Sequence, residues 1–381
     1  MMNPNLTDGR KRSTSPTVSV ERIGWLDSVT LVLPRFMAGF TFVDWMRVLH
    51  HNEWRVDPIF VPRAAAATAG TVVTSLLKPF DDACCLDPAD DPAWRRPIFI
   101  LGCARSGTTH LFNLLARDER FAHATQLDVF HPHTFLTLRR LGLHRLLRFQ
   151  PSRRRAMDNV RVGWLSPAED SIALAVLAAS GDPQQAVFRR TAPLGAMPSK
   201  VFRSALAAFT RKLVHVHHRS LLLKSPGHME RIPDILAVFP DARFVTIFRD
   251  PRSTLASVLS FFRSPGVLWS ALQWPPPRGV DDLIGEMGVS MDRYFEARDL
   301  IPPANLVEVR HEDLVADESG TLGAIYTWLG IAPPSSALRA AARGESSRPY
   351  SRNVHPPLDD AVRAKLETAC RRLFDAGWYV A

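Results

Sequence analysis

Four short apolar runs in the second part of the chain have the pattern of buried strands. They cover residues 97–101, 220–223, 243–248 and 305–309. Each run is nearly continuous in apolar residues and is followed by a helical repeat, which is typical of parallel strands joined by right-handed helical crossovers. The pattern therefore predicts an α/β fold with a central parallel sheet flanked by helices.

Two further regions have the apolar periodicity of helices. Residues 21–80 place large side chains such as Trp45 and Trp54 at helical spacing. We interpret them as a helical layer packed on the main domain, with a lid or a membrane-touching surface as the alternative. The residues between the first two strands predict a large helical insertion that shapes a substrate pocket. Residues 81–96, rich in Asp and Pro, have no such period and predict a linker.

The N-terminus is polar and basic, with no apolar core behind it. Residues 1–20 therefore predict a disordered tail and not a signal peptide. The longest apolar stretches, residues 31–43 and 64–77, are too short or too interrupted to span a bilayer. We expect a cytoplasmic protein without a transmembrane segment, in which a helical region and linker at 21–93 pack on a main domain at 94–381.

The chain has 381 residues and a formal net charge of +9. This charge fits an anionic ligand, nucleic acid or an acidic membrane surface. We disfavour nucleic acid because no basic stripe interleaved with aromatic residues accompanies the charge. His215, His217 and His218 lie close together, but no Cys or carboxylate completes a ligand set, so no bound metal is expected. The four cysteines form no disulfide framework.

A glycine-containing loop, GCARSGTT, follows the first predicted strand at residues 102–109. Its glycines have P-loop spacing, but two threonines stand where an NTPase has Lys and Ser or Thr. Such a loop lets backbone N–H groups converge on an anion, and the next helix adds the positive end of its dipole. The missing lysine disfavours triphosphate chemistry. The candidate anion ligands are Gly102, Ala104, Arg105, Ser106, Gly107, Thr108 and Thr109.

A second basic motif follows the third predicted strand. Arg249 ends this strand, and Ser257 comes eight positions later. Asp250 can cap the next helix and Pro251 suits its first position, which puts Ser257 about two turns into the helix on the face toward Arg249. An arginine and a hydroxyl so placed can grip a second phosphate. A capped helix without a ligand, or a Mg²⁺-binding Asp250 in an NTPase, are the alternatives.

Together these motifs resemble the sulfotransferases that use 3′-phosphoadenosine-5′-phosphosulfate (PAPS). The resemblance rests on the Ser-Gly-Thr-Thr that ends the loop and on the Arg249-to-Ser257 spacing. Lys224-Ser225-Pro226, the turn at 240–245 and the segment at 311–331 agree with it, so it covers about residues 94–331. It implies a P-loop NTPase-like sulfotransferase fold and transfer of a sulfuryl group to a hydroxyl or amine of a small organic or carbohydrate acceptor. PAPS is the implied donor, with 3′-phosphoadenosine-5′-phosphate (PAP) as product, without a metal.

The resemblance also implies roles for single residues. Arg105 and Lys224 take the positions of the cations that contact the transferring group, while Arg249 and Ser257 take those of the 3′-phosphate site. His311 stands where the family often has an adenine-contacting tyrosine. Arg343 and Gly344 fall where the family has a basic loop over the 3′-phosphate.

The general base is left open by the sequence. Pro226 occupies the position at which cytosolic members carry a catalytic histidine. Glu169 and Asp128 are the preferred candidates, ahead of His228, and a carboxylate base would need a pKa raised by burial. The competing functions are a P-loop kinase that uses Mg-ATP and a non-catalytic anion- or nucleic-acid-binding protein. The sequence indicates neither the acceptor nor the oligomeric state.

Overall fold

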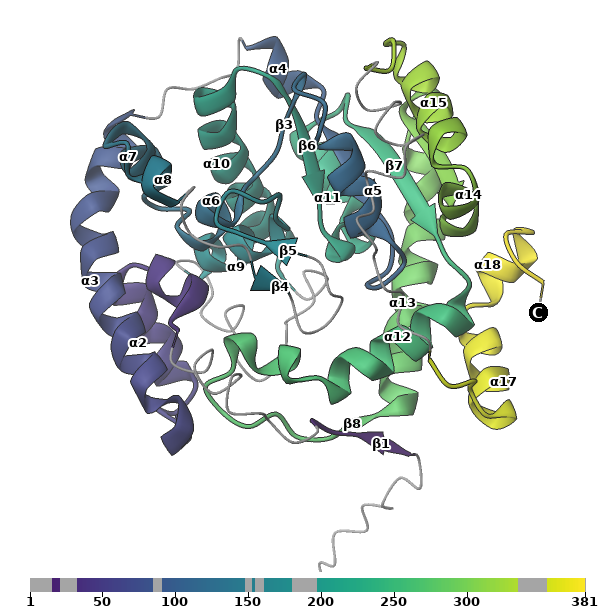
Figure 1. The fold of residues 1–381 in the computed structure, drawn as a ribbon, viewed down its shortest axis with the longest axis horizontal. Coiled ribbons are helices and arrows are strands. Elements are labelled where there is room, and N and C mark those ends of the chain that lie inside the picture. The colour runs from purple at the N-terminus through teal and green to yellow at the C-terminus, as the bar shows by residue number, and fades with distance from the viewer. Residues whose placement is uncertain are drawn as a thin grey trace, which may run out of the picture.

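The four apolar runs form parallel strands of one sheet in the computed structural model (Figure 1). The structure describes residues 16–20, 33–84, 91–147, 153–154, 161–179, 197–334 and 355–380. The sheet has five strands in the order β3-β6-β2-β7-β9, and every neighbouring pair is parallel. Their bounds are Ile98–Leu101 (β2), Phe121–Ala122 (β3), Ser220–Lys224 (β6), Arg243–Phe248 (β7) and Leu306–Arg310 (β9). The predicted α/β fold is confirmed.

The strands alternate between two apolar layers, which explains why their sequences are almost wholly apolar. Ile98 and Ile100 of β2 belong to a cluster with α5 (Thr108–Leu115), α14 (His311–Ala316) and α15 (Glu318–Leu329). Phe99 and Leu101 belong to a larger cluster on the other face. That cluster includes side chains of α10 (Ser199–His217), α11 (Ile232–Val238) and α13 (Val280–Ala297). A strand covered on both faces needs apolar residues at every position.

The strand register determines where the functional loops meet. Ile100 of β2 is paired with Lys224 at the end of β6 and with Val245 of β7. Since parallel strands end at the same edge of a sheet, the loop after β2, Lys224 and the residues after β7 emerge side by side. This is the edge at which an open parallel sheet binds its ligands.

The helical insertion between β2 and β6 is confirmed. It contains α6 (Gln126–Phe130), α7 (Phe135–Arg140), α8 (Leu143–Leu146), α9 (Ser171–Ala178) and α10, with the short strands β4 (Arg153–Arg154) and β5 (Arg161–Val162). Further described elements follow β6. They are η6 (Pro226–Glu230), α12 (Pro251–Arg263), η7 (Pro265–Ser270), β8 (Arg278–Gly279), η8 (Arg298–Leu300), η9 (Pro303–Asn305), α17 (Asp360–Ala369) and α18 (Arg371–Asp375).

The N-terminal region packs on the main domain through its own apolar cluster. It comprises η1 (Arg35–Gly39), α2 (Phe42–His51), η2 (Pro58–Phe60) and α3 (Val61–Cys84). Trp45 and Phe60 are fully buried there against Val176 and Leu272 of the main domain. Figure 1 shows α3 at the outer edge of the molecule, away from the sheet.

Two boundary predictions are wrong where the structure describes the chain. Residues Thr17–Val18 form strand β1, which pairs antiparallel with β8, so they are not part of a disordered tail. The predicted linker at 81–96 is also too long. Its first residues belong to α3, and Pro92–Arg95 form the short helix α4, which Asp91 caps. Residues 1–15 and 85–90 lie outside the described part.

The apolar stretch at 64–77 lies within a longer helix than the sequence suggested. Within the described ranges, the helical segment Pro58–Ala83 is long and apolar enough to cross a bilayer by length and composition, and 28% of its apolar window is buried. Core helices of soluble proteins pass the same test, so the finding is weak evidence for a membrane span. The expectation that the chain has no transmembrane segment therefore stays a prediction.

Candidate active site

The loop between β2 and α5 has a backbone that admits only glycine at two positions. Gly102 has φ 155°, and a Cβ there would lie 2.7 Å from the carbonyl oxygen of Ile247. Gly107 has φ 99° and caps α5, and a Cβ there would lie 2.3 Å from the His311 ring. The two glycines therefore let the loop pass close to β7 and under His311, as an anion-binding turn requires.

The loop also carries a buried hydroxyl that can serve an anion. Ser106 is buried, and within the described ranges its Oγ has no hydrogen-bond partner. Thr108 is buried at the first turn of α5, whereas Ala104 is exposed at the tip of the loop. An unsatisfied buried hydroxyl beside a helix N-terminus is a donor set that suits a phosphate or sulfate.

The loop and the second basic motif are joined by hydrogen bonds. The Arg105 Nε donates to the Ser257 Oγ at 3.1 Å, and the Arg249 Nη1 donates to the Arg105 carbonyl oxygen at 3.1 Å. Asp250 caps α12 by accepting from the Arg252 backbone N–H at 2.8 Å. The sequence-predicted Arg105, Arg249 and Ser257 thus belong to one basic site at the end of the sheet.

Two histidines border this basic site. His311 begins α14, and its ring lies over Gly107. His355 was not predicted, because nothing in its local sequence distinguishes it. Its pKa is lowered first by burial and then by the positive charges of Arg249 and Arg105, so it lies within electrostatic range of both arginines. Arg343 and Gly344 lie outside the described residues.

Lys224 and Glu169 form a close ion pair next to the loop. The Lys224 Nζ donates to Glu169 Oε1 at 2.5 Å and to Thr109 Oγ1 at 3.1 Å. Lys224 is 1% exposed, whereas the Glu169 side chain is 33% exposed. The carboxylate is therefore reachable from outside, while the ammonium is held between the carboxylate and the loop. This pairing gives Glu169 the geometry of a base beside a fixed cation.

Asp128 does not have the geometry of a base, contrary to one sequence-based hypothesis. Its side chain is fully buried and forms a capping box with Thr125 at the start of α6. Its Oδ2 also accepts from the Arg139 Nη2 at 2.8 Å. With both oxygens occupied and no exposed surface, the carboxylate stabilises the insertion and cannot reach an acceptor.

His228 is likewise too deeply buried to contact an acceptor. Its Nε2 lies 2.8 and 2.9 Å from the two carboxylate oxygens of Asp170, and its ring packs edge-on against Phe99 and Phe202. The hypothesis that His228 is the base is therefore wrong. Asp170 follows Glu169 directly, and His228 follows Lys224 by four positions. The buried pair thus ties together the two segments that carry the Lys224–Glu169 ion pair.

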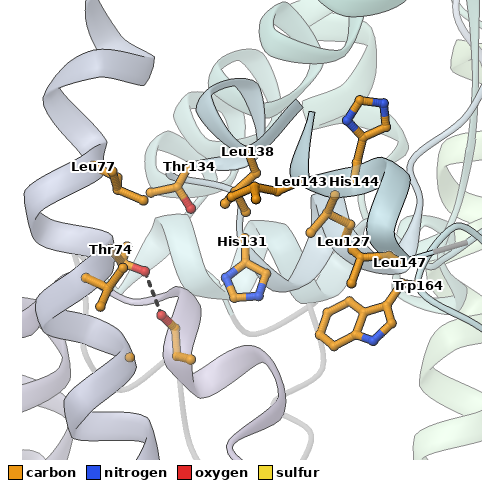
Figure 2. A pocket seen from close by; sticks show the side chains of 13 residues that line it. Thr74, Leu77, Leu127, His131, Thr134, Leu138, Leu143, His144, Leu147 and Trp164 are labelled. Carbon is orange, nitrogen blue, oxygen red and sulfur yellow. Dashed lines mark hydrogen bonds between the residues drawn. The ribbon is translucent and has the colours of Figure 1, made fainter. Parts of the chain in front are cut away.

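An apolar cavity of about 340 Å³ lies between α3 and the segment from α6 to α8 (Figure 2). Thr74 and Ala38 also line it, and Thr74 donates to the Ala38 carbonyl oxygen at 2.7 Å, the hydrogen bond drawn dashed in Figure 2. Burial lowers the pKa of His131 to about 4, so this ring is neutral at pH 7. The cavity is lined chiefly by Leu77, Leu127, Leu138, Leu143, Leu147 and Trp164.

The cavity is linked to the ion pair by a short loop. Trp164 stacks on His131 with ring centroids 6.1 Å apart, and it precedes Glu169 by five positions. The backbone N–H of Leu127 donates to the Trp164 carbonyl oxygen, and Thr125 bridges to Pro167. One loop therefore lines the apolar cavity and presents Glu169. Within the described ranges, no three His, Cys, Asp or Glu side chains are grouped to hold a metal ion.

Comparison with known sequences identifies one family and two relatives. Residues 97–334 match the family model described as "Sulfotransferase family". The omega-hydroxy-beta-dihydromenaquinone-9 sulfotransferase Stf3 of Mycobacterium bovis is 28% identical over 311 residues, which cover 77% of this chain and 78% of that protein. The protein of the same name from Mycobacterium tuberculosis matches to the same extent.

Two solved structures share the fold. Sulfotransferase STF9 from Mycobacterium avium superposes with a TM-score of 0.55 at 20% identity, covering 94% of this chain and 92% of that chain. Sulfotransferase STF1 from Mycobacterium tuberculosis superposes with a TM-score of 0.50 at 17% identity, covering 92% of this chain and 94% of that chain. At these identities the likeness concerns the fold.

Proposed function

The chain belongs to the sulfotransferase family, and on that premise we propose that it takes a sulfuryl group from PAPS and transfers it to a hydroxyl of an apolar acceptor. Sulfuryl transfer is the activity of the family, so the kinase and the non-catalytic binding protein are not favoured. The donor, the acceptor class and the residue roles are the parts that we propose.

The donor assignment is supported by two anion-binding features that lie together. The loop amides with Ser106 and Thr108 suit the 5′ end of the nucleotide, and Arg249 with Ser257 suits a 3′-phosphate. The observation that carries the assignment is the Arg105 Nε–Ser257 Oγ hydrogen bond of 3.1 Å, because it joins the two features. A nucleotide that carries phosphate groups on both its 5′ and its 3′ oxygen would contact both of these anion-binding features. When bound, PAPS supplies a sulfuryl group attached to a phosphate leaving group.

The chain's own residues then have distinct roles. Arg105 and Lys224 offset the negative charge of the transferring group and of the leaving phosphate. Glu169 takes the proton of the acceptor hydroxyl, since its carboxylate is partly exposed and the Lys224 Nζ, 2.5 Å away, fixes its position beside the loop. His311 borders the nucleotide site over Gly107. None of these roles calls for a metal ion.

The acceptor class is supported by the cavity beside Trp164. Its apolar lining suits a hydrocarbon body better than a carbohydrate, whose hydroxyls need polar partners. The Stf3 relatives act, by name, on a hydroxylated dihydromenaquinone, which is consistent with a hydroxyl on an apolar molecule. We also propose residues 94–381 as the sulfotransferase domain and a cytoplasmic location.

Calorimetric titration tests the donor assignment. We expect PAP to bind tightly in EDTA, and ATP with Mg²⁺ to bind weakly. Adenosine 5′-phosphate, which lacks the 3′-phosphate, serves as the matched control and should bind more weakly than PAP. Tighter binding of Mg-ATP than of PAP would overturn the assignment.

A further inference from the structure

Helix α3 has its apolar side chains on the outside. Between Val61 and Phe80, every residue of this helix that is exposed is apolar. The largest of them include Val72, Leu76 and Phe80, and the last two are 68% and 62% exposed. A helix on the surface of a water-soluble domain has the opposite arrangement, with polar residues outward and apolar residues toward the core.

Four polar side chains of α3 are buried instead, namely Arg63, Thr71, Thr74 and Asp81. Arg63 is fully buried and donates to the carbonyl oxygens of Leu268 and Ala271 at 2.8 and 2.6 Å. Asp81 is fully buried, accepts from two backbone N–H groups of α7 and pairs with Lys212. If α3 left the fold to span a bilayer, these charged groups would lose their partners. The helix therefore stays docked and lies along the surface.

Residues 141–147, which comprise the turn after α7 and helix α8 and are called the α7–α8 turn below, extend the same apolar face. Leu141 and Leu146 are each 63% exposed. The turn adjoins α3, because Leu143 and Leu147 line the apolar cavity together with Val73 and Leu77 of α3. Figure 1 shows α7 and α8 beside α3 at the edge of the molecule. We call these exposed apolar side chains of α3 and of the α7–α8 turn the outer apolar face.

Cations flank this face. Arg140 precedes the α7–α8 turn and Arg145 lies within it, and both side chains are exposed. On α3, Lys78 lies between Leu76 and Phe80 and pairs with Asp82. The chain as a whole carries a net charge of +9. An apolar face bordered by arginine suits the interface of an anionic bilayer, where apolar groups enter the acyl region and cations meet the headgroups.

We propose that the outer apolar face seats on the surface of an anionic lipid bilayer. A second copy of the chain is a poorer occupant for two reasons. The flanking arginines of the two copies would repel each other if the faces met directly. In addition, the exposed Val73 and Leu143 line the apolar cavity, so the cavity opens onto this face and a second copy would cover it. A bilayer, in contrast, can supply the cavity with an apolar acceptor. This last argument rests on the proposed function.

Vesicle flotation with the full chain tests the proposal. Wild-type protein should float with vesicles of phosphatidylcholine and phosphatidylglycerol, and it should float less with phosphatidylcholine alone or at high NaCl concentration. Leu76→Glu/Phe80→Glu, which alters no cavity-lining residue, should lower vesicle partitioning at least about tenfold. The matched control is Val289→Glu/Leu300→Glu, which changes two exposed apolar residues outside this face and should float like wild type.

Three results would overturn the proposal. They are wild-type protein that does not float with anionic vesicles, a Leu76→Glu/Phe80→Glu variant that floats as well as wild type, and wild-type protein that sediments as a dimer which this variant converts to monomer. Circular dichroism and PAP titration of each variant establish that the fold and the donor site are intact. Because PAP binding requires no lipid, failure of the donor assignment is distinguishable from failure of vesicle binding.

Discussion

The Arg105 Nε lies 3.1 Å from the Ser257 Oγ, although 152 positions separate the two residues in the sequence. The backbone of Arg105 is in the left-handed region, with φ 70°, a conformation that residues other than glycine seldom adopt. The hydroxyl on α12 therefore helps to orient the one basic side chain of the loop. A P-loop NTPase places its lysine at the start of the helix, whereas here the cation comes from within the loop and is held by the second basic motif.

Arg105→Ala should lower turnover strongly without unfolding the protein. The substitution removes a positive charge from the proposed path of the sulfuryl group, so we expect kcat/KM to fall by about 10³-fold, the size of losing one preorganised oxyanion donor. Sulfuryl transfer from PAPS measures the effect, and circular dichroism monitors the fold. Turnover near the wild-type rate in a folded variant would remove Arg105 from the mechanism.

Arg249→Ala should weaken binding of PAP far more than binding of adenosine 5′-phosphate. The lost charge-assisted hydrogen bonds correspond to roughly 10- to 100-fold in affinity for the nucleotide that has a 3′-phosphate. Titration calorimetry with both nucleotides measures the difference. Arg263→Ala, at the C-terminal end of the helix that follows Arg249, is the matched control. Equal losses for both nucleotides would refute the 3′-phosphate role.

Glu169→Gln should lower kcat by about 10²- to 10⁴-fold, the usual contribution of a general base. The amide keeps the size of the side chain and can still contact Lys224, but it cannot accept the acceptor's proton. The affinity for PAP should change little. Glu286→Gln, an exposed carboxylate paired with Arg278, is the control. A kcat within a few-fold of wild type would exclude Glu169 as the base.

The sequence predicted those helices and strands in which buried apolar residues recur at a regular spacing or form a continuous run. Strands β6 and β7 were placed correctly, because short runs of apolar residues bounded by turns are typical of strands covered on both faces. Strand β3 was missed since Phe121–Ala122 has only two residues, too few for any pattern. The apolar period of α3 was visible, but periodicity does not tell which face meets the core.

The candidate site was predicted where one loop carries a whole motif, and less well where partners are distant in sequence. Arg249 and Ser257 are close because a capped helix follows a strand. His228 and Asp170 are 58 positions apart. The sequence shows that both residues are ionisable, but it does not show that they form a buried pair. His355 reaches the basic site from the C-terminal region, which no local pattern indicates.

His228→Phe should lower kcat while leaving the affinity for PAP nearly unchanged. The phenyl ring fits among Phe99 and Phe202 but leaves the buried Asp170 without its partner, so the segment that carries Glu169 loses its anchor. His228→Gln, whose amide can donate to Asp170, should restore most of kcat. The split between kcat and nucleotide affinity identifies a positioning role. If both variants have wild-type kcat once the folded fraction is taken into account, the pair contributes only to stability.

Proton uptake on PAP binding should depend on His355. In the free protein, burial and the charges of Arg249 and Arg105 lower the pKa of this histidine below its usual value near 6.5. The 3′-phosphate offsets the two arginine charges and favours the imidazolium, so the pKa rises in the complex. A group with a higher pKa in the bound state takes up a proton, and affinity then increases as the pH falls between the bound and free pKa values.

This linkage has a measurable size and sign. Calorimetry in buffers of different ionisation enthalpy counts the protons taken up on PAP binding. Protons taken up by the phosphate groups of PAP are the same for all variants, so a difference between variants reports on the protein. Wild-type protein should take up more protons than His355→Asn near pH 6, and its affinity for PAP should gain more on acidification, by at most about tenfold per pH unit for one proton. Identical proton counts for the two proteins would show that the 3′-phosphate does not lie beside His355. The donor would then have to be oriented differently against Arg249, since the same charges that lower the pKa of His355 are those proposed to hold the phosphate.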